Sequence, residues 1–376
     1  MRRTRMAVTV TVTATALSLG AVACSGTTAP SGHPNSAASA AASSTAAASA
    51  AAAVRQSGQK PAPKPLVGVN LYVGENYSLA ETKAWGARDL AYIADTLRLK
   101  AVAIAWDYNV PSPSSDSVAA SSSRTPTIAD LAALTSIARS HGLRVEYRVL
   151  YAIGNSDSRN ESIQPKNLTA WLHSLLAAET PALKLAQRDH VSEFVAGTEM
   201  ASIDQSPLWG GFFAKAGRLY HGTLSYASWG GKSGFGGFFS SQRVPLPLRY
   251  FGASAYPPVN LPATASVAQL TKAWVAFLRR APQWLLHLTA IDETGIPAVA
   301  GAYHDPYQWD GLEHAQPDLA VQANWYRAAC QAADLVHVRA LYFWSAVLSS
   351  DPASAQSSLE GFEGHPATEA AIRSCS

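Results

Sequence analysis

Two glutamates stand at the ends of short, mostly apolar segments that are far apart in the sequence. Glu199 closes the segment 193–199 and Glu293 closes the segment 288–293, and each segment is typical of a buried strand. In a barrel of parallel strands, chemistry takes place where strands end and loops begin, so the two side chains could meet at one mouth. A pair of carboxyl groups across one cavity is the apparatus of glycoside hydrolysis. We therefore predict Glu199 and Glu293 as a catalytic pair.

Short β-rich runs alternate with helical stretches along residues 66–376, and these elements must position the pair. The predicted strands cover residues 66–71, 101–106, 144–150, 191–197, 222–227, 250–255, 285–291 and 338–343. Helices are expected over about 81–97, 127–140, 168–187, 207–219, 267–280 and 319–333, with a last short one that reaches residue 373. Eight such units favour a closed (β/α)8 TIM barrel in a single domain. An open doubly wound sheet rarely has so many equal units, and no Gly-x-Gly-x-x-Gly motif follows the first strand.

Two aromatic residues take matching places on other strands. Side chains along a strand point alternately into and out of a barrel. Tyr256 stands at the end of the sixth predicted strand, and Trp344 stands at the end of the eighth. Together with Glu199 and Glu293, they would occupy the same rim of the barrel.

Four short motifs on these strands carry a resemblance to a known family. They are, in order on strands four, six, seven and eight, Gly197-Thr198-Glu199, Ser254-Ala255-Tyr256-Pro257, Asp292-Glu293-Thr294-Gly295 and Tyr342-Phe343-Trp344. Over roughly residues 66 to 350 the chain resembles a clan A glycoside hydrolase, most closely the family 113 mannanase-like barrels. The resemblance implies a retaining hydrolase that acts on a β-linked polysaccharide or oligosaccharide, mannan-like substrates included.

The resemblance also assigns roles to the four rim residues. It implies that Glu199 is the acid/base and that Glu293 is the nucleophile. Tyr256 would donate a hydrogen bond to the nucleophile, and Trp344 would form the floor of a sugar subsite. The chain departs from the family pattern at Thr198, because many clan members have an asparagine there that binds the sugar 2-hydroxyl. We expect the contact with that hydroxyl to differ in this chain.

Other polar and aromatic side chains are candidates for binding the substrate. Asn70, Trp106 and Asp107 end the first and second predicted strands, where they could bind sugar hydroxyls or pack at the barrel rim. Trp229 and Trp309 lie in loops after strands five and seven, where their rings could stack on sugar faces or pack within the loops.

Three charged residues of the third and fourth predicted strands would face the inside of the barrel. Glu146 and Arg148 share one face of strand three, and we expect Arg148 to form a buried ion pair with Glu146 and Glu193. Arg148 could instead reach the nucleophile.

The first residues have the features of an export signal. Arg2, Arg3 and Arg5 precede a mostly apolar run that is too short to span a bilayer comfortably. The small residues before Cys24 resemble a bacterial lipobox, which implies a signal peptide over residues 1–23 and a lipid on Cys24. An ordinary secretory signal that is cut nearby is the alternative, and Arg2-Arg3 is also compatible with twin-arginine export.

The composition of the chain after this signal argues against nucleic acid and charged membrane surfaces as partners. Residues 24–65 are expected to be a disordered tether, because Ser, Ala, Thr, Gly and Pro dominate them. The chain has 29 Lys and Arg against 26 Asp and Glu, so removal of the three signal arginines leaves equal numbers. A neutral chain has no electrostatic footprint for nucleic acid and no basic belt for anionic lipid. We therefore expect an extracytoplasmic monomer that contacts the membrane through its lipid only, or a secreted one.

Two of the three cysteines are expected to form a disulfide. If Cys24 carries lipid, Cys330 and Cys375 remain as an even pair in an exported chain. Both fall in predicted late helices, which a barrel would place side by side. No Cys-x-x-Cys or His-Glu-x-x-His motif is present, so the spacing predicts no metal site, and we expect no cofactor.

Two classes of function agree with these observations. The first is a surface-anchored retaining glycosidase, and the second is a non-catalytic barrel that binds carbohydrate in the same cleft. The presence of both Glu199 and Glu293 favours the enzyme, because a binding protein has no need of both. A carbohydrate is the expected partner in either case.

Overall fold

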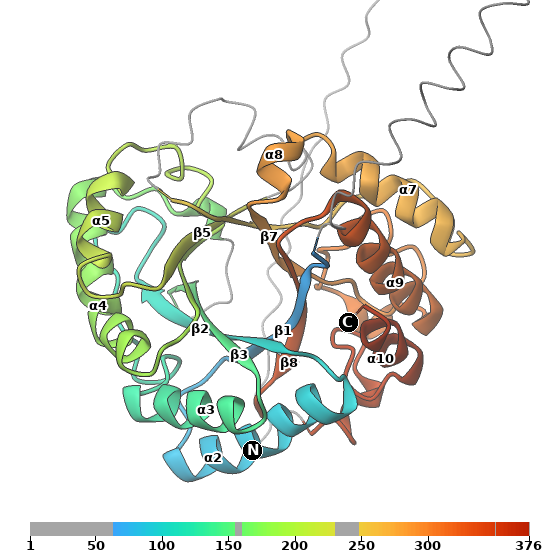
Figure 1. Ribbon diagram of the computed structural model, residues 1–376, viewed down its shortest axis with the longest axis horizontal. Helices are drawn as coiled ribbons and strands as arrows, with labels where there is room; N and C mark the ends of the chain where they lie inside the picture. Colours follow the sequence, from blue (N-terminus) through green and yellow to red (C-terminus); the bar gives the residue numbers. More distant parts are fainter. Residues whose placement is uncertain (1–62, 155–159, 230–247, 350, 376) are drawn as a thin grey trace, which may run out of the picture. The chain divides into compact units, whose positions relative to one another are not determined.

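Eight parallel strands form a closed barrel in the computed structural model, which describes residues 63–154, 160–229, 248–349 and 351–375 (Figure 1). The strands are β1 (Leu66–Val73), β2 (Ala101–Val110), β3 (Arg144–Ile153), β4 (Glu193–Thr198), β5 (Thr223–Trp229), β6 (Phe251–Ser254), β7 (Thr289–Thr294) and β8 (Ala340–Val347). Each strand pairs with the next along the chain, and β8 closes the barrel against β1. The predicted (β/α)8 barrel is confirmed.

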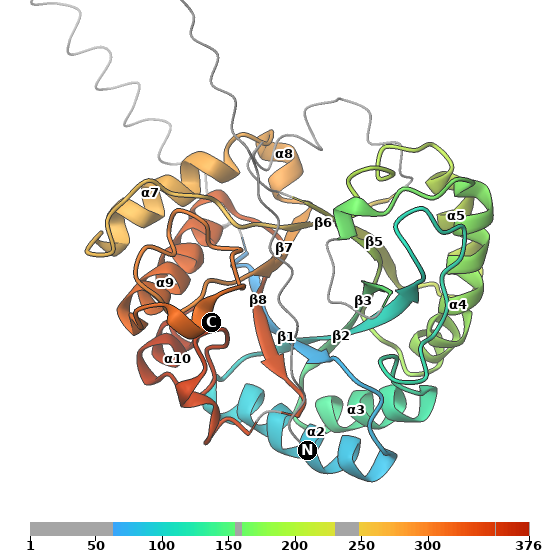
Figure 2. The same ribbon diagram turned by 180° about the vertical axis from the view of Figure 1, so that it is seen from behind.

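Helices surround the barrel, as the two opposite views show (Figures 1 and 2). They are α2 (Leu79–Ala91), α3 (Ile128–Ser140), α4 (Leu168–Arg188), α5 (Trp209–Ala216), α7 (Val267–Leu278), α8 (Gln283–Leu286), α9 (Leu319–Val336) and α10 (Pro366–Arg373). A π-helical turn follows α2 over Tyr92–Thr96, and 3-10 turns cover Asn160–Ser162, Leu312–His314 and Ala355–Ser357. Within the described part of the chain, none of these helices is long and apolar enough to cross a membrane.

Several helices begin at capping boxes that can be read in the sequence. Thr127 accepts a hydrogen bond from the backbone N–H of Asp130, and its own backbone N–H donates to the Asp130 carboxylate at 2.9 Å. The same reciprocal arrangement starts α2 at Ser78 with Glu81 and α7 at Ser266 with Gln269. These bonds satisfy N–H groups that the first helical turn leaves without partners, so each helix starts at a defined residue.

The predicted start of the seventh strand is wrong. Residues 285 and 286 belong to α8, and β7 begins only at Thr289. Leu285 and Leu286 are buried, so in the sequence they continue the apolar run of the strand although they lie in a helix. A short apolar run does not by itself distinguish a buried strand from a buried helix.

Strands β2 and β3 extend beyond their predicted ends. They pair residue by residue, from Ala101 with Arg144 up to Val110 with Ile153. The added residues of each strand form backbone hydrogen bonds with the added residues of the other strand. Both strands therefore continue past the end of their apolar runs. As a result Asp107 lies inside β2 rather than after it.

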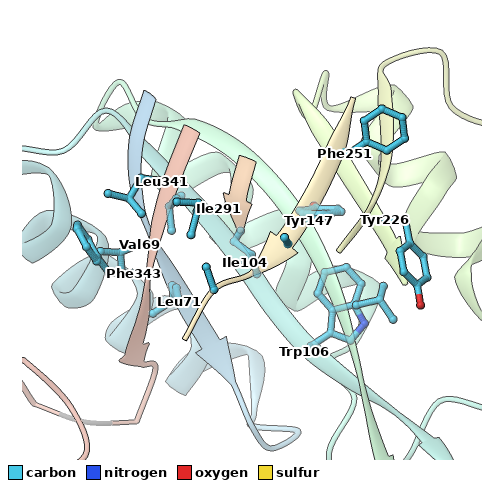
Figure 3. Packing of buried hydrophobic residues seen from close by; sticks show 14 of the residues in the cluster. Val69, Leu71, Ile104, Trp106, Tyr147, Tyr226, Phe251, Ile291, Leu341 and Phe343 are labelled. Carbon is cyan, nitrogen blue, oxygen red and sulfur yellow. The ribbon is translucent and has the colours of Figure 1, made fainter. Parts of the chain in front are cut away.

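Alternation along the strands separates an outer core from the barrel interior. The outer core lies between strands and helices and includes Val69, Ile104, Trp106, Tyr147 and Phe343 (Figure 3). A smaller interior cluster consists of Ala101, Ala103, Ala290, Ala340 and Tyr342. Successive residues of β2 thus fall into different clusters, as the pleat of a strand requires.

Charged side chains occupy the rest of the interior, but not in the expected pairs. The Glu193 carboxylate accepts hydrogen bonds of 2.6 and 2.7 Å from Arg339, and Arg148 pairs with Glu293 at 2.8 Å. The predicted ion pair of Arg148 with Glu146 and Glu193 is therefore wrong, and the alternative partner Glu293 is confirmed. Glu146 lies opposite Glu193 in the strand register. Burial, and secondly the neighbouring carboxylates, raise the pKa of Glu146 well above its ordinary value.

The structure joins Cys330 and Cys375 in a disulfide. Cys330 lies in α9, and Cys375 follows α10, which packs against α9. Their Cα atoms are 5.3 Å apart, within the range that disulfides require. The bond ties the last helix to the helix before it.

Removal of this disulfide should lower the free energy of unfolding by about 2–4 kcal/mol, because the unfolded chain regains the freedom of the loop that the bond closes. We expect the double variant Cys330→Ala/Cys375→Ala to show this loss in urea unfolding at equilibrium. The reduced wild-type protein is the matched control and should unfold with the double variant. Equal midpoints for the oxidised wild type and the double variant would contradict the expectation.

Candidate active site

A cleft of about 560 Å³ lies at the C-terminal ends of the strands. Glu199 directly follows β4, Glu293 is the penultimate residue of β7, and both border the cleft. Other lining residues are Tyr72, Asp107, Tyr151, Asn160, Trp309 and Trp344. The volume is in the usual range for a ligand pocket, so the two predicted glutamates share one cavity large enough for a small substrate segment.

Both carboxylate oxygens of Glu293 are held by fixed donors. The Tyr256 hydroxyl donates to Oε1 at 2.5 Å, and Arg148 Nη2 lies 2.8 Å from Oε2. Arg148 is completely buried, whereas the Glu293 side chain remains 13% exposed toward the cleft. A cation and a hydroxyl donor stabilise a negative carboxylate in this position and prevent it from turning. Glu293 therefore has a fixed orientation with a donor at each oxygen, and Tyr256 donates the hydrogen bond that was predicted for it.

Glu199 has the opposite environment. Desolvation by the surrounding protein, and secondly the negative charge of Glu293, raise the pKa of Glu199 to about 8. Contacts with Ser254 and Arg148 act in the other direction and limit the rise. The backbone N–H of Glu199 donates to the Ala227 carbonyl of β5 at 2.8 Å, which holds this residue in a left-handed conformation with φ of 58°. Glu199 is therefore a protonated acid at neutral pH.

A layer of hydrogen bonds beneath the pair positions Arg148. The guanidinium donates to the backbone carbonyl of Asp292, to Ser254 Oγ at 3.2 Å and to Asn70 Oδ1 at 3.4 Å. Asn70 Nδ2 in turn donates to the carbonyls of Asp292 (3.0 Å) and Phe343 (3.3 Å). These contacts join β1, β3, β6, β7 and β8 around one cation, so the position of Arg148 depends on closure of the whole barrel.

On one side of the cleft, the aromatic rings of Trp344 and Tyr72 lie beside the carboxylate of Asp107. Trp344 borders the cleft, and its ring lies 5.4 Å from the ring of Tyr72, measured between centroids. The Tyr72 hydroxyl donates to Asp107 Oδ2 at 2.5 Å, and Arg124 lies 3.5 Å from the same oxygen. Asp107 is thus fixed at the cleft surface, where its carboxylate oxygens are available to accept hydrogen bonds from hydroxyl groups.

The two tryptophans predicted to lie in loops differ in position, and the prediction is wrong for Trp229, which is the last residue of β5. Trp309 borders the cleft and packs over Gly295, where an added Cβ would lie 3.4 Å from the ring. Trp229 ends β5, and its ring centroid is 6.0 Å from that of Tyr256 and 5.7 Å from that of Tyr307. Trp309 therefore presents a ring to the cleft, while Trp229 packs against the tyrosine that holds Glu293.

Besides Tyr256 and Trp229, three further predicted substrate-binding residues do not border the cleft. Trp106 is completely buried in the outer core, with its ring against those of Tyr147 and Phe194. Thr198 and Asn70 are also completely buried and are absent from the cleft lining. These three side chains therefore present no surface to the cleft in this structure. Asn70 acts instead on the protein itself, through the bonds that position Arg148.

Several residues of the site were not predicted from the sequence. Tyr72 lies two positions after Asn70, so alternation would have found it if the first strand had been read to its full length. Ser254 lies within the motif that contains Tyr256, but its role depends on Arg148 from a distant strand. Asn160 comes from a 3-10 turn after β3, and nothing in its local sequence points to the cleft.

The described residues contain no group of three or more His, Cys, Asp or Glu side chains that could hold a metal ion. Carboxyl groups such as those of Glu199 and Glu293 are capable of proton transfer and of nucleophilic attack.

Comparison with known proteins gives the following matches. The model of Glycoside Hydrolase Family 113 matches residues 72–362. The fold is similar to that in "Complex structure of GH113 beta-1,4-mannanase", with a TM-score of 0.67 and 18% identity over 83% of this chain and 99% of that chain. It is also similar to the GH113 beta-mannanase AaManA from Alicyclobacillus acidocaldarius in complex with ManMIm, with a TM-score of 0.65 and 20% identity over 83% and 97% of the two chains. No curated protein sequence matches the chain.

Proposed function

Because this chain belongs to glycoside hydrolase family 113 and is a glycoside hydrolase, we propose that it cleaves a β-linked glycan with retention of configuration. The observation that carries the proposal is the contrast between two carboxyl groups on one cleft. Glu293 has a donor at each oxygen, whereas the pKa of Glu199 is raised to about 8. A neutral acid beside an ionised carboxylate is the pair that double displacement requires.

In the first step, Glu293 attacks the anomeric carbon while Glu199 gives its proton to the leaving oxygen. The bond between the anomeric carbon and the leaving oxygen breaks as the bond to the glutamate oxygen forms, and a glycosyl-enzyme results. Arg148 and Tyr256 hold the attacking carboxylate in one orientation, which lowers the cost of reaching the reactive geometry.

In the second step, Glu199 acts as a base. It takes a proton from a water molecule, and the water oxygen bonds to the anomeric carbon as the ester bond to Glu293 breaks. The electron pair of that bond returns to Glu293, and Glu199 regains the proton that it held at the start. Two inversions at the same carbon give net retention of configuration.

We infer a β-1,4-mannan as the substrate class. The inference is supported by the GH113 mannanase structures, which share this fold over 97–99% of their own length. Trp344 and Trp309 present rings to the cleft for stacking on sugar faces, and Asp107 offers a carboxylate to hydroxyl groups.

A release assay against a panel of glycans tests the proposal. We expect the wild-type protein to release reducing sugar from β-1,4-mannan, and Glu293→Gln to lose at least about 10³-fold of this rate, because an amide is a poor nucleophile. The panel should include cellulose, xylan and a β-1,3-glucan. If no glycan is cleaved and one of them binds in the cleft, the protein is a carbohydrate-binding barrel and not an active hydrolase.

We also propose that the protein is held at the outer face of a membrane by a lipid on Cys24. The proposal rests on the basic, apolar and small residues that precede this cysteine in the sequence. Mass spectrometry of the detergent-extracted protein should show a diacylglycerol-sized addition at Cys24, and Cys24→Ser should release the protein into the soluble fraction. A soluble wild-type protein with a free N-terminus elsewhere would show ordinary secretion instead.

A further inference from the structure

Ser254 ends β6 and faces the inside of the barrel. It is completely buried, and in the strand register it lies opposite Glu293 of β7. Gly252, two residues earlier, lies against the Asp292 carboxylate so closely that an added Cβ would be 1.7 Å from Oδ2. Ala253 belongs to the outer core, so alternation places Ser254 on the interior side, beside the catalytic glutamates.

The hydroxyl of Ser254 connects the two halves of the catalytic pair. Arg148 Nη2 lies 2.8 Å from Glu293 Oε2 and also donates to Ser254 Oγ at 3.2 Å. The Ser254 hydroxyl in turn forms a hydrogen bond with the Glu199 carboxyl group. A guanidinium only donates hydrogen bonds, so Ser254 must accept from Arg148 and keeps its single proton for Glu199.

We propose that Ser254 is a positioning residue that links the Arg148 guanidinium to the acid/base carboxyl group, so that one cation stabilises whichever catalytic glutamate is negative. The proposal rests on the function proposed above. It adds a residue that touches neither substrate nor the reacting carbon and that acts through Glu199.

The contact through Ser254 matters because negative charge moves from Glu293 to Glu199 in the first step. Before the step, Glu293 is negative and Glu199 carries a proton. As Glu293 forms the ester bond, Glu199 loses its proton to the leaving oxygen, so the negative charge passes from one glutamate to the other. Arg148 stays in place during this transfer, and the Ser254 hydroxyl provides the donor that the new carboxylate needs.

The expected direction of the effect follows from the direction of the hydrogen bond. A donor to a carboxylate favours the charged form, so its removal raises the pKa of Glu199 further. The other charged or titratable groups that act on Glu199 are Glu293, Arg148, Glu161, Tyr226 and Tyr256. None of these groups is changed by the replacement of Ser254, so a shift in the pKa of Glu199 is an effect of the lost hydroxyl.

The first experiment is the pH profile of kcat/KM on the glycan that the wild type cleaves. The alkaline limb of the wild type should lie near pH 8, where Glu199 loses its proton. Ser254→Ala should move this limb up by about one pH unit and lower kcat/KM by about tenfold at neutral pH, because the acid becomes weaker. Ser254→Thr keeps the hydroxyl and should keep the limb in place. Ser225→Ala removes another completely buried serine, one without a hydrogen-bond partner among the described residues, and should leave the limb unchanged.

The second experiment follows the Glu199 carboxyl directly, by infrared difference titration against Glu199→Gln. A higher titration midpoint in Ser254→Ala supports the proposal, and an unchanged midpoint and alkaline limb overturn it, whatever the loss in rate. If Ser254→Ala does not fold by circular dichroism, Ser254→Cys replaces it, since a thiol is a weaker donor of similar shape. A shifted midpoint in a protein that cleaves no glycan would uphold the Ser254 contact and reject the proposed function.

Discussion

Replacement of Glu293 by alanine should abolish glycan turnover, with a loss on the order of 10⁴-fold or more, because no glycosyl-enzyme can form. The donors of Arg148 and Tyr256 remain and can bind a small anion where the carboxylate was. Azide should therefore restore part of the turnover by attacking the anomeric carbon from the side of the missing glutamate. The product is a glycosyl azide of inverted configuration, which NMR of the isolated sugar identifies.

Glu75→Ala is the matched control for this variant. Glu75 is an exposed glutamate in the loop after β1, and it is absent from the cleft lining. We expect the control to keep wild-type turnover and to show no response to azide. Near wild-type activity in Glu293→Ala, or an azide product of retained configuration, would assign the nucleophile to another residue.

Replacement of Glu199 by alanine should lower turnover of the natural glycan by about 10²–10⁴-fold, the usual contribution of general acid–base catalysis. The leaving oxygen of a sugar needs a proton, whereas an activated aryl leaving group does not. The first step on such an aryl glycoside should therefore be almost unaffected, and the glycosyl-enzyme should accumulate. Azide should then release it as a product of retained configuration, because Glu293 has already inverted the anomeric carbon once.

A series of aryl glycosides with leaving groups of increasing basicity measures this effect. Glu199→Ala should show a steep fall in rate with leaving-group basicity, and the wild type a shallow one, since only the wild type provides a proton. Equal slopes for both proteins would show that Glu199 is not the acid. Ser225→Ala, which changes a buried residue outside the catalytic pair, should follow the wild-type slope.

The fold and the meeting of Glu199 and Glu293 at one cleft could be predicted because both depend on local features of the chain. Apolar runs of strand length alternate with stretches of helical pattern, and Thr127 marks a helix start that the structure reproduces. Glu199 and Glu293 stand at the ends of two of these runs. Once the strands are parallel and the barrel is closed, residues at their C-terminal ends lie at one mouth, so the two glutamates had to approach each other.

The neighbours Trp106 and Asp107 show that an apolar run does not mark the end of a strand. The run stops at residue 106, which predicts that both residues end the strand, but β2 continues to Val110. Inside a strand, neighbouring side chains face opposite sides. Asp107 therefore lines the cleft while Trp106 packs in the outer core.

The sequence by itself determined the barrel, the disulfide partners and the approach of Glu199 and Glu293 to one mouth, because runs, counts and spacings are properties of the chain. Only the tertiary structure decided which buried charges are paired. In the sequence, Arg148 has two alternatives, an ion pair with Glu193 or one with Glu293. Its distance from each carboxylate depends on how far the strands extend and on where the barrel closes. Burial and these pairings in turn make Glu199 a neutral acid and leave Glu293 with two donors, although the two residues are chemically identical.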